Sequence, residues 1–377
     1  MITFYYQPNA NWIAESYYYL NTIRTLSYLR DDERPAVLVY CPDESAFVEF
    51  SKIKYPELKL VSRKQVFSQG FFDRVLNKLR IKVFTPGFRN LGGTIGYFSY
   101  GVLDSIRPLV QNLDKVIVWI PDLQELVLPE FFSSEEIERR KEIHQKIILQ
   151  GNEIVFSSDS ARKDFINAYP GAQNKMHIYH FSSILPEHNH VSFSAIKAKY
   201  SVHESYYFAP NQFWAHKNQL VILKALLLLR EQGLYPKVVF TGKQVDLRNP
   251  GYSNEIHSFI SENNLNDQVK ILGFIDRIDQ LVLMKASLAV IQPSLFEGWS
   301  TVVEDCKAMG KSIIVSDINV HREQDHPAAR YFSPKDPKQL ADAITADISS
   351  QIEFPVSYLY DNQIVKSANE ILSIFKA

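Results

Sequence analysis

The chain has 377 residues, of which 46% are hydrophobic and 22% are charged, and its formal net charge is −1. This length suffices for two domains, and the composition is that of an ordinary globular protein. The near-zero charge argues against nucleic acid as a partner, because a nucleic-acid binder needs a strongly positive surface. The only cysteines, Cys41 and Cys306, form no metal or disulfide pattern, which fits a reducing cytosol.

No targeting or membrane-spanning segment is predicted. Residues 1–8 have neither a basic start nor a long apolar run, so we do not expect a signal peptide. The most apolar stretch, 221–229, is interrupted by Lys224 and is far shorter than the roughly 18 residues that a membrane span needs. We therefore expect a soluble, cytoplasmic protein.

The N-terminal half alternates strand and helix patterns. A helix is predicted over 12–29, and strands are predicted over 2–6, 36–40, 58–61, 116–120 and 154–157. Strands separated by helices imply parallel pairing in a doubly wound sheet, in which ligands bind beyond the carboxyl ends of the strands.

Two polar turns follow strands in this half. Asn11 and Trp12 come after the first strand, where they either line a site or act as a helix cap and a core aromatic. Asp122, Gln124 and Glu125 follow the strand ending at Ile120, where they either line a cleft or form a polar strand-to-helix loop.

Two further stretches give weaker signals. Residues 71–84 mix apolar side chains with four basic ones; this is either a solvated helix face or a surface for an anionic membrane. Gly92, Gly93 and Gly96 lack the dinucleotide-binding spacing and predict a loop.

A boundary is predicted near residues 181–200, where Ser, Pro and His replace periodic apolar residues. The histidines in and near this segment are His177, His180, His188 and His190. No Cys or carboxylate accompanies them at a regular spacing, so we interpret the segment as a hinge and expect no metal site.

The C-terminal half repeats the strand–helix pattern. Strands are predicted over 206–209, 237–241, 269–272, 288–291, 312–315 and 330–332. Lys217 stands at the entrance of a helix that begins near Asn218, where a compact cation can reach a diphosphate. Gly242 with Lys243, and Gly273 with Phe274 and Ile275, end two further strands at the same edge.

The most informative stretch is 291–310, in which a strand, an acidic glycine loop and a helix follow one another. Ser300 or Thr301 can cap the helix, whose N-terminus is a ready anion site, and Gly298 lets the backbone approach closely. A helical wheel leaves Glu304 on the solvated side and turns Asp305 toward a ligand.

The sequence PSLFEGWSTVVEDCKAMG at 293–310, followed by IIVSD at 313–317, resembles the donor-site signature of retaining GT-B glycosyltransferases of family 4. Those enzymes carry two Glu separated by seven residues; Glu297 matches the first, and Asp305 stands in the place of the second. The resemblance implies that Glu297 contacts the donor sugar, that backbone N–H groups of Gly298, Trp299, Ser300 and Thr301 hold the diphosphate, and that Asp305 takes the ribose hydroxyls. It also implies that the loop of Phe274 and Ile275 holds the base.

This chain departs from the family pattern at several positions. Ala14 and Glu15 replace paired glycines, and Glu125 stands where a histidine often faces the donor sugar. We expect Glu125 to be a third catalytic residue beside Glu297 and Lys217, because a carboxylate can bond sugar hydroxyls or handle the acceptor proton, although it cannot donate as an imidazole does. The family arginine that supports the leaving phosphate is missing, since Asn211 or Gln212 occupies its place.

The resemblance implies an α/β GT-B fold with two Rossmann-like domains that face each other across a cleft. We expect an acceptor-side domain at 1–185, a donor-binding domain at 186–355, and a final segment at 356–377 whose helix packs back on the first domain.

The implied activity is metal-independent, cofactor-free transfer of a hexose-like sugar, with retention, from a nucleoside diphosphate sugar. The acceptor would be a glycan or lipid-linked hydroxyl, as in bacterial surface polysaccharide or lipopolysaccharide synthesis at the inner face of the membrane. The departures leave open a non-catalytic protein that binds sugar nucleotides or glycans on the same fold, and a GT-B epimerase remains a second enzyme alternative.

Overall fold

The structure is a computed structural model that describes residues 1–7, 13–42, 44–62, 95–102, 113–350, 353–355 and 358–377. The chain divides into two compact units. The first comprises Met1–Asp122, Glu138–Ser182 and Asp361–Ala377, and the second comprises Leu123–Ile137 and Ser183–Tyr360. Each unit is built on one parallel sheet, so the predicted α/β class and doubly wound architecture are confirmed.

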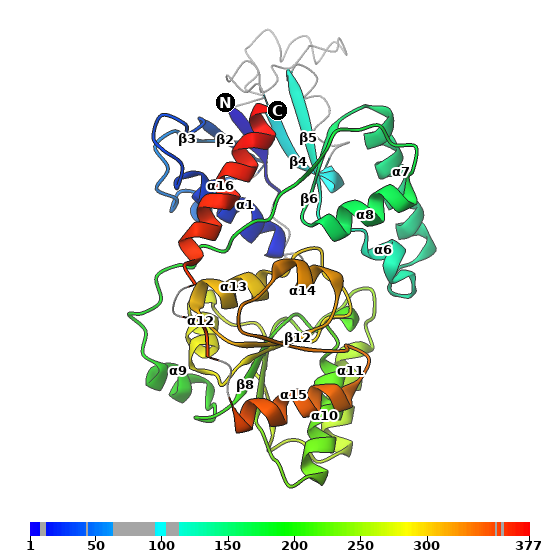
Figure 1. The fold of residues 1–377 in the computed structure, drawn as a ribbon, viewed down its shortest axis with the longest axis vertical. Coiled ribbons are helices and arrows are strands. Elements are labelled where there is room, and N and C mark those ends of the chain that lie inside the picture. The colour runs from blue at the N-terminus through cyan, green and yellow to red at the C-terminus, as the bar shows by residue number, and fades with distance from the viewer. Residues whose placement is uncertain (8–12, 43, 63–94, 103–112, 351–352, 356–357) are drawn as a thin grey trace, which may run out of the picture. The chain divides into compact units, whose positions relative to one another are not determined.

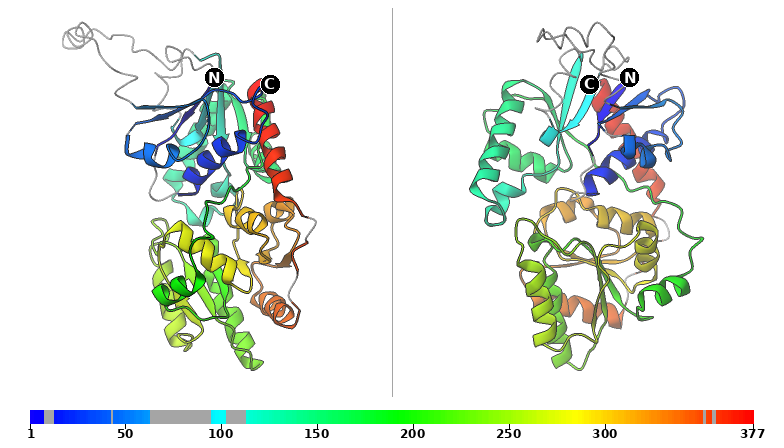
Figure 2. Two further views of the ribbon diagram at one scale, coloured as in Figure 1. Left: turned by 90° about the vertical axis from the view of Figure 1, so that its left-hand side faces the viewer. Right: turned by 180° about the vertical axis from the view of Figure 1, so that it is seen from behind.

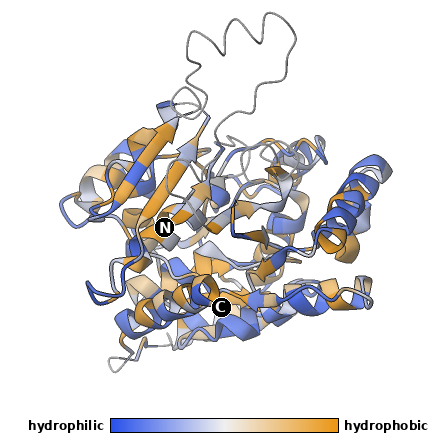
Figure 3. Cartoon of the chain, turned by 90° about the horizontal axis from the view of Figure 1, so that it is seen from above, coloured by the Kyte–Doolittle hydropathy of each residue, from blue (hydrophilic) through white to orange (hydrophobic). Residues whose placement is uncertain are grey.

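The sheet of the first unit has the strand order β3-β2-β1-β4-β5-β6-β7 (Figure 1). Its strands are β1 (Ile2–Tyr5), β2 (Val37–Cys41), β3 (Leu58–Ser62), β4 (Ile95–Ser99), β5 (Lys115–Ile120), β6 (Glu153–Phe156) and β7 (Met176–Ile178). These strands are coloured mainly as hydrophobic in Figure 3, as expected for a parallel sheet buried on both faces.

The helices of the first unit include one contributed by the C-terminus. They are α1 (Ile13–Leu26), α2 (Phe47–Phe50), most of α7 (Ser134–Leu149), α8 (Asp159–Ala168) and α16 (Tyr360–Lys376), with short 3-10 turns at Glu44–Ala46 and Tyr100–Val102. Helix α16 is fastened to this unit by a 2.9 Å hydrogen bond from Lys115 Nζ to the carbonyl of Ile374. The ring of Phe375 also meets those of Phe4 and Tyr97 edge-on. The C-terminal segment Asp361–Ala377 therefore belongs to the first unit, together with the N-terminal segment.

The second sheet has the order β10-β9-β8-β11-β12-β13 (Figure 1). Its strands are β8 (Tyr207–Pro210), β9 (Val238–Thr241), β10 (Val269–Ile271), β11 (Val290–Gln292), β12 (Ile313–Ser316) and β13 (Ala329–Phe332). Its helices are α6 (Gln124–Val127), α9 (Phe193–Tyr200), α10 (Gln219–Glu231), α11 (Tyr252–Glu262), α12 (Arg277–Ala286), α13 (Thr301–Met309), α14 (Asn319–Gln324) and α15 (Pro337–Ser349), with 3-10 turns at Pro129–Phe131 and Ala215–Lys217.

Alternating residues of these strands fill two separate cores. Tyr207, Ile291 and Ile314 pack on one face with α10, α11 and α15, whereas Phe208 and Val290 pack on the other with α9, α12 and α13. Successive side chains of a strand point to opposite faces, so apolar runs cover both sides of the sheet. Figure 2 shows the helices on both faces of this sheet.

Two strands of the first sheet were not predicted. Strand β7 is short, and β4 contains Gly96, which we expected in a loop. A Cβ at Gly96 would approach the ring of Phe98 to 2.3 Å and the side chain of Leu113 to 2.6 Å. This glycine is therefore explained by close packing within a strand. Gly92 and Gly93 lie outside the described residues, as does the basic stretch 71–84.

Helix α13 begins and ends where its sequence predicts. Ser300 is the N-cap, whose hydroxyl accepts from the backbone N–H of Val303. Gly310 is the C-cap with a φ of 69°, a left-handed conformation that favours glycine. None of the helices in the described ranges is long and apolar enough to cross a membrane.

Candidate functional site

Lys217 and Glu297 form an ion pair in the second unit. Lys217 Nζ lies 2.6 Å from Glu297 Oε1, and their side chains are only 14% and 9% exposed. Lys217 ends the 3-10 turn after β8, and Glu297 lies in the loop after β11. Because β8 and β11 are adjacent and parallel, their carboxyl ends meet at one edge of the sheet. The structure thus joins two residues predicted to share a site, although they are 80 positions apart.

Gln292 extends this pair into a hydrogen-bonded cluster. Its amide nitrogen donates to Glu297 Oε1 at 2.8 Å, and its amide oxygen accepts from Asn211 at 2.8 Å. Ser294 donates to the same carboxylate oxygen at 2.6 Å. Glu297 is therefore held in one orientation by a cation, an amide and a hydroxyl.

The charge state of Glu297 follows from these contacts. Burial acts to raise the pKa of its carboxyl, but the charge of Lys217, the neighbouring His321 and the hydrogen bonds of Lys217 and Ser294 outweigh burial, so the pKa is lowered. His321 is 1% exposed, and burial lowers its pKa to about 4 although Glu297 acts in the opposite direction. At neutral pH, Glu297 is thus a carboxylate and His321 a neutral imidazole.

The loop and first turn of α13 complete this edge. Gly298, Trp299 and Ser300 are buried, and Thr301 is half-buried as the first helical residue. The N–H of Ser300 donates to Gln324 Oε1 at 3.1 Å, so one of the predicted phosphate-binding N–H groups has a protein partner in this structure. Binding of a diphosphate by Gly298 to Thr301 stays a prediction.

Two further predicted loops meet at the same edge. The N–H of Gly242 donates to the carbonyl of Gly273 at 2.8 Å, and Lys243 Nζ lies 5.6 Å from the ring centre of Phe274. Phe274 is 61% exposed, whereas Ile275 is buried.

Gly242 cannot carry a side chain without rearrangement. It has a φ of 127°, and a Cβ there would lie 2.2 Å from the carbonyl oxygen of Asn211. The adjacent Gln212 accepts from the N–H of Lys243 at 2.9 Å. The predicted residues after β8 and β9 are thus in direct backbone contact.

Glu304 contradicts the helical-wheel prediction, because it is fully buried rather than solvated. It accepts from Lys307 at 3.2 Å, from Gln324 at 3.0 Å and from Tyr360 at 2.8 Å. A helical wheel considers one helix alone, whereas Gln324 of α14 and Tyr360, the first residue of α16, cover this side of α13.

Asp305 is also buried, at 1% exposure. One of its oxygens pairs with Arg277 at 2.7 Å, and the other accepts from Ser183. That Asp305 takes ribose hydroxyls stays a prediction, since both oxygens have protein partners here.

The predicted cleft residues that follow β5 belong to different units. Gln124 and Glu125 lie on α6 and belong to the second unit, with exposures of 7% and 2%, whereas Asp122 ends the first segment of the first unit. Gln124 accepts a 3.0 Å hydrogen bond from Arg248, which follows β9. Asn11 and Trp12 lie outside the described residues.

Sequence reasoning missed Gln292, His321 and Gln324. Gln292 ends β11, and a buried polar residue at a strand end was an available signal. His321 and Gln324 lie in the HREQ sequence that follows β12. Only the electrostatic interaction of His321 with Glu297 and the hydrogen bond of Gln324 with Ser300 mark them. No group of three or more His, Cys, Asp or Glu suited to a metal occurs in the part of the chain that is described.

Residues 196–358 match the family model described as glycosyl transferases group 1. The matched range lies within the second unit and contains every member of the cluster around Glu297. A stretch of 141 residues is 26% identical to the O-antigen chain mannosyltransferase RfbU of Salmonella typhimurium. This stretch covers 37% of the chain and 38% of that protein, so the likeness spans well under half of either.

The fold is also that of solved glycosyltransferase structures. HepE of Anabaena in complex with UDP and glucose aligns with a TM-score of 0.69 and 17% identity, over 100% of this chain and 99% of that one. WaaG, a glycosyltransferase involved in lipopolysaccharide biosynthesis, aligns with a TM-score of 0.58 and 11% identity over 98% and 95%. At these identities the likeness is one of fold, and the fold is GT-B.

Proposed function

We propose that this chain, in which residues 196–358 match the family model of glycosyl transferases group 1, moves a sugar from a nucleoside diphosphate sugar to a hydroxyl, with retention at the anomeric carbon. The observation that carries the proposal is the buried Lys217–Glu297 pair beside the first turn of α13. It offers a cation and a fixed carboxylate at the sheet edge where ligands of such folds bind.

The proposed chemistry assigns different work to the two residues. The bond between the anomeric carbon and the diphosphate oxygen breaks, and Lys217 with the N-terminus of α13 stabilises the charge on the leaving diphosphate. Glu297 positions the sugar through its hydroxyl groups. The acceptor oxygen forms the new bond on the same face, and its proton passes to the departing phosphate oxygen.

In this proposal no metal ion or other cofactor is needed, because Lys217 and the helix dipole supply positive charge. Glu125 is proposed as a third catalytic group, whose carboxylate bonds sugar hydroxyls. Gly242, Lys243, Phe274 and Ile275 are proposed to line the donor side, together with Asn211 and Gln212. The acceptor is proposed to be a glycan or lipid-linked intermediate of a bacterial surface polysaccharide, at the inner face of the membrane. The names of RfbU and WaaG support this acceptor class.

Thermal-shift binding tests the donor site. UDP, GDP, dTDP and CMP are each added with and without chelator, since a ligand that binds only the folded state raises Tm by mass action. We expect a rise with one nucleoside diphosphate that the chelator leaves unchanged. No rise with any of the four would contradict the donor site, and a rise abolished by chelator would contradict metal independence.

A non-catalytic sugar-nucleotide-binding protein is the second candidate. Two observations favour it. The carboxylate of Asp305 and the N–H of Ser300 are both predicted to bind the donor, but in this structure each has a protein partner. Release of nucleoside diphosphate from sugar nucleotides separates the two functions. Binding without any release, across donors and acceptors, would favour this candidate.

A further inference from the structure

The loop after β9 is fixed by an aspartate to the turn that carries Lys217. Asp246 is 3% exposed. Its carboxylate accepts from the N–H of Ala215 at 3.0 Å and from the N–H of Arg248 at 3.0 Å. Because Ala215 begins the 3-10 turn that ends at Lys217, Arg248 has a defined place relative to the candidate site.

The guanidinium of Arg248 lies among aromatic and polar groups of two chain segments. It donates to Gln124 Oε1 at 3.0 Å, and its centre lies 4.6 Å from the ring of Phe132 and 5.6 Å from that of Trp214. Its second terminal nitrogen lies 3.5 Å from Nδ1 of His216. The planar guanidinium can stack on rings while its edges donate hydrogen bonds, which an ammonium cannot do.

His216 is suited to accept from this arginine. It is 5% exposed, and burial lowers its pKa well below the usual value, with further lowering by the charges of Lys217 and Arg248. The ring is therefore neutral at pH 7 and keeps one nitrogen as an acceptor. The backbone carbonyl of His216 accepts from Leu295 at 2.8 Å, so this residue also borders the loop of Glu297.

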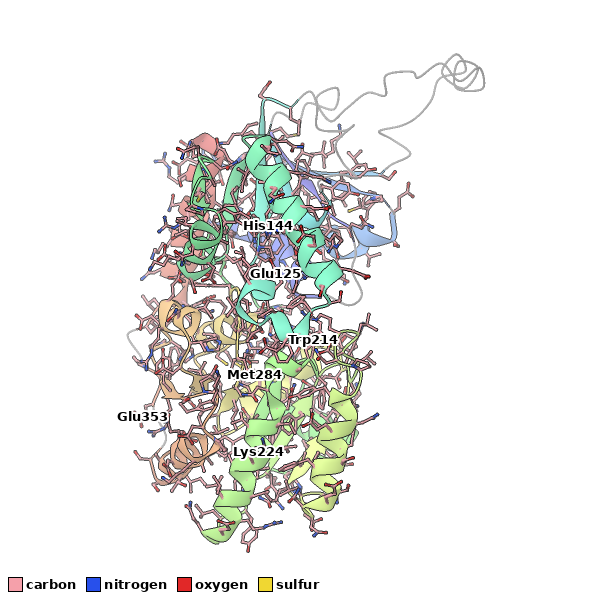
Figure 4. All side chains as sticks on the ribbon, turned by 90° about the vertical axis from the view of Figure 1, so that its right-hand side faces the viewer. Glu125, His144, Trp214, Lys224, Met284 and Glu353 are labelled. Carbon is pink, nitrogen blue, oxygen red and sulfur yellow. The ribbon has the colours of Figure 1, made fainter. Side chains whose placement is uncertain are left out.

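Arg248 thus contacts the segment Leu123–Ile137 near its start, at Gln124, and near its middle, at Phe132. Glu125 lies between these two contacts, on the single short turn of α6 (Figure 4). A four-residue helix has little stability of its own, so its position depends on tertiary contacts. The segment belongs to the second unit, although it follows β5 of the first in sequence.

We propose that Arg248 is a positioning residue, which holds α6 so that Glu125 keeps a fixed place relative to Lys217 and Glu297. This inference rests on the proposed function for its catalytic consequence, but the positioning itself is testable without a substrate. Arg248 acts through Glu125 and contacts no reacting atom.

Hydrogen exchange on the full chain without ligand tests the positioning. The variants are Arg248→Met, which removes the guanidinium, and Arg248→Lys, which keeps the charge but loses the planar fork. Arg230→Met is the matched control, because Arg230 also donates to another segment, at 2.7 Å to the carbonyl of Asn263. We expect both Arg248 variants to lose protection in residues 123–132, and the control to keep it. Unchanged protection in Arg248→Met would overturn the proposal whatever the protein does with nucleotides.

A double-mutant cycle tests the route through Glu125. The donor is the one found by the thermal-shift screen. Arg248→Met is expected to lower kcat by about 10²-fold, because a misplaced catalytic group costs a loss of this order. The affinity for the nucleoside diphosphate is expected to stay unchanged. In a Glu125→Gln background the same change is expected to have no further effect. Additive losses would show that Arg248 does not act through Glu125. If the unsubstituted protein binds no nucleotide, the proposed function fails while the exchange result still decides the positioning.

Discussion

The hydroxyl of Tyr360 donates a 2.8 Å hydrogen bond to Glu304 and accepts one of 2.8 Å from the backbone N–H of Ser183. Ser183 and Tyr360 are the two ends of the long segment of the second unit. Ser183 also donates to Asp305, so both ends are attached to neighbouring acidic residues of α13. The helix that begins at the candidate site thus also anchors both ends of the long segment of this unit.

Glu304→Ala is expected to destabilise the second unit by about 3–5 kcal/mol, because it leaves the ammonium of Lys307 without its carboxylate. Lys307 and Glu304 have side-chain exposures of only 5% and 0%. Denaturant unfolding measures the loss, and Glu262→Ala, at an exposed position of α11, is the control. A change below about 1 kcal/mol, as for a surface ion pair, would contradict the buried network.

Lys217→Ala is expected to reduce kcat by about 10²–10³-fold, the loss that follows removal of one donor to a developing negative charge. Glu297→Ala is expected to abolish transfer with the fold retained. Steady-state kinetics with the donor identified by thermal shift measure both. Lys224→Ala, which changes a lysine on α10 outside the Glu297 cluster, is the control. Near-normal turnover in either site variant would remove that residue from the proposed mechanism.

Buried histidines are expected to make the protein acid-sensitive. Burial lowers the pKa of His144 to about 4, of His321 to about 4 and of His326 to about 3. The unfolded chain therefore binds more protons than the folded one as the pH falls below about 6.5, and stability falls with it. Each histidine contributes up to about 1.4 kcal/mol per pH unit until its folded pKa is reached.

The midpoint of urea unfolding, measured from pH 7 to 4.5, tests this contribution. His326→Gln should flatten the dependence, whereas His257→Gln should not, because His257 is exposed. Parallel curves for all three proteins would contradict a contribution of His326 to the acid sensitivity.

Glu15 is expected to destabilise the folded protein as the pH rises, whereas the buried histidines destabilise it as the pH falls. Burial raises the pKa of its carboxyl to about 7, although a hydrogen bond with Ser99 acts to lower it. The folded state thus holds a proton that the unfolded state has lost, so the destabilisation grows from about pH 4.5 and is complete above pH 7. Glu15→Gln should therefore raise the unfolding midpoint more at pH 8 than at pH 5. An equal effect at both pH values would contradict the raised pKa.

The sequence alone determined the class of fold and the principal members of the candidate cluster. Apolar runs separated by helical patterns predicted eleven of the strands that the structure describes, with small shifts at their ends. They could be predicted because a parallel strand that is buried on both faces is a nearly continuous apolar run in the sequence. Ser300 and Gly310 likewise marked the ends of α13, since caps are set by the residues at the helix ends. Glu297 was predicted from the resemblance of residues 293–310 to a family signature, and Lys217 from its place at a helix entrance in a stretch with the same resemblance.

The tertiary structure decided which polar groups are buried and what they contact. Glu304 is buried because α14 and Tyr360 cover a side of α13 that a helical wheel leaves exposed. His321 and Arg248 gain their roles from residues more than 20 positions away, so no local pattern marks them. Periodicity and capping depend on neighbours in sequence, whereas burial, pKa and hydrogen bonding depend on neighbours in space, which only the packing of the whole unit brings together.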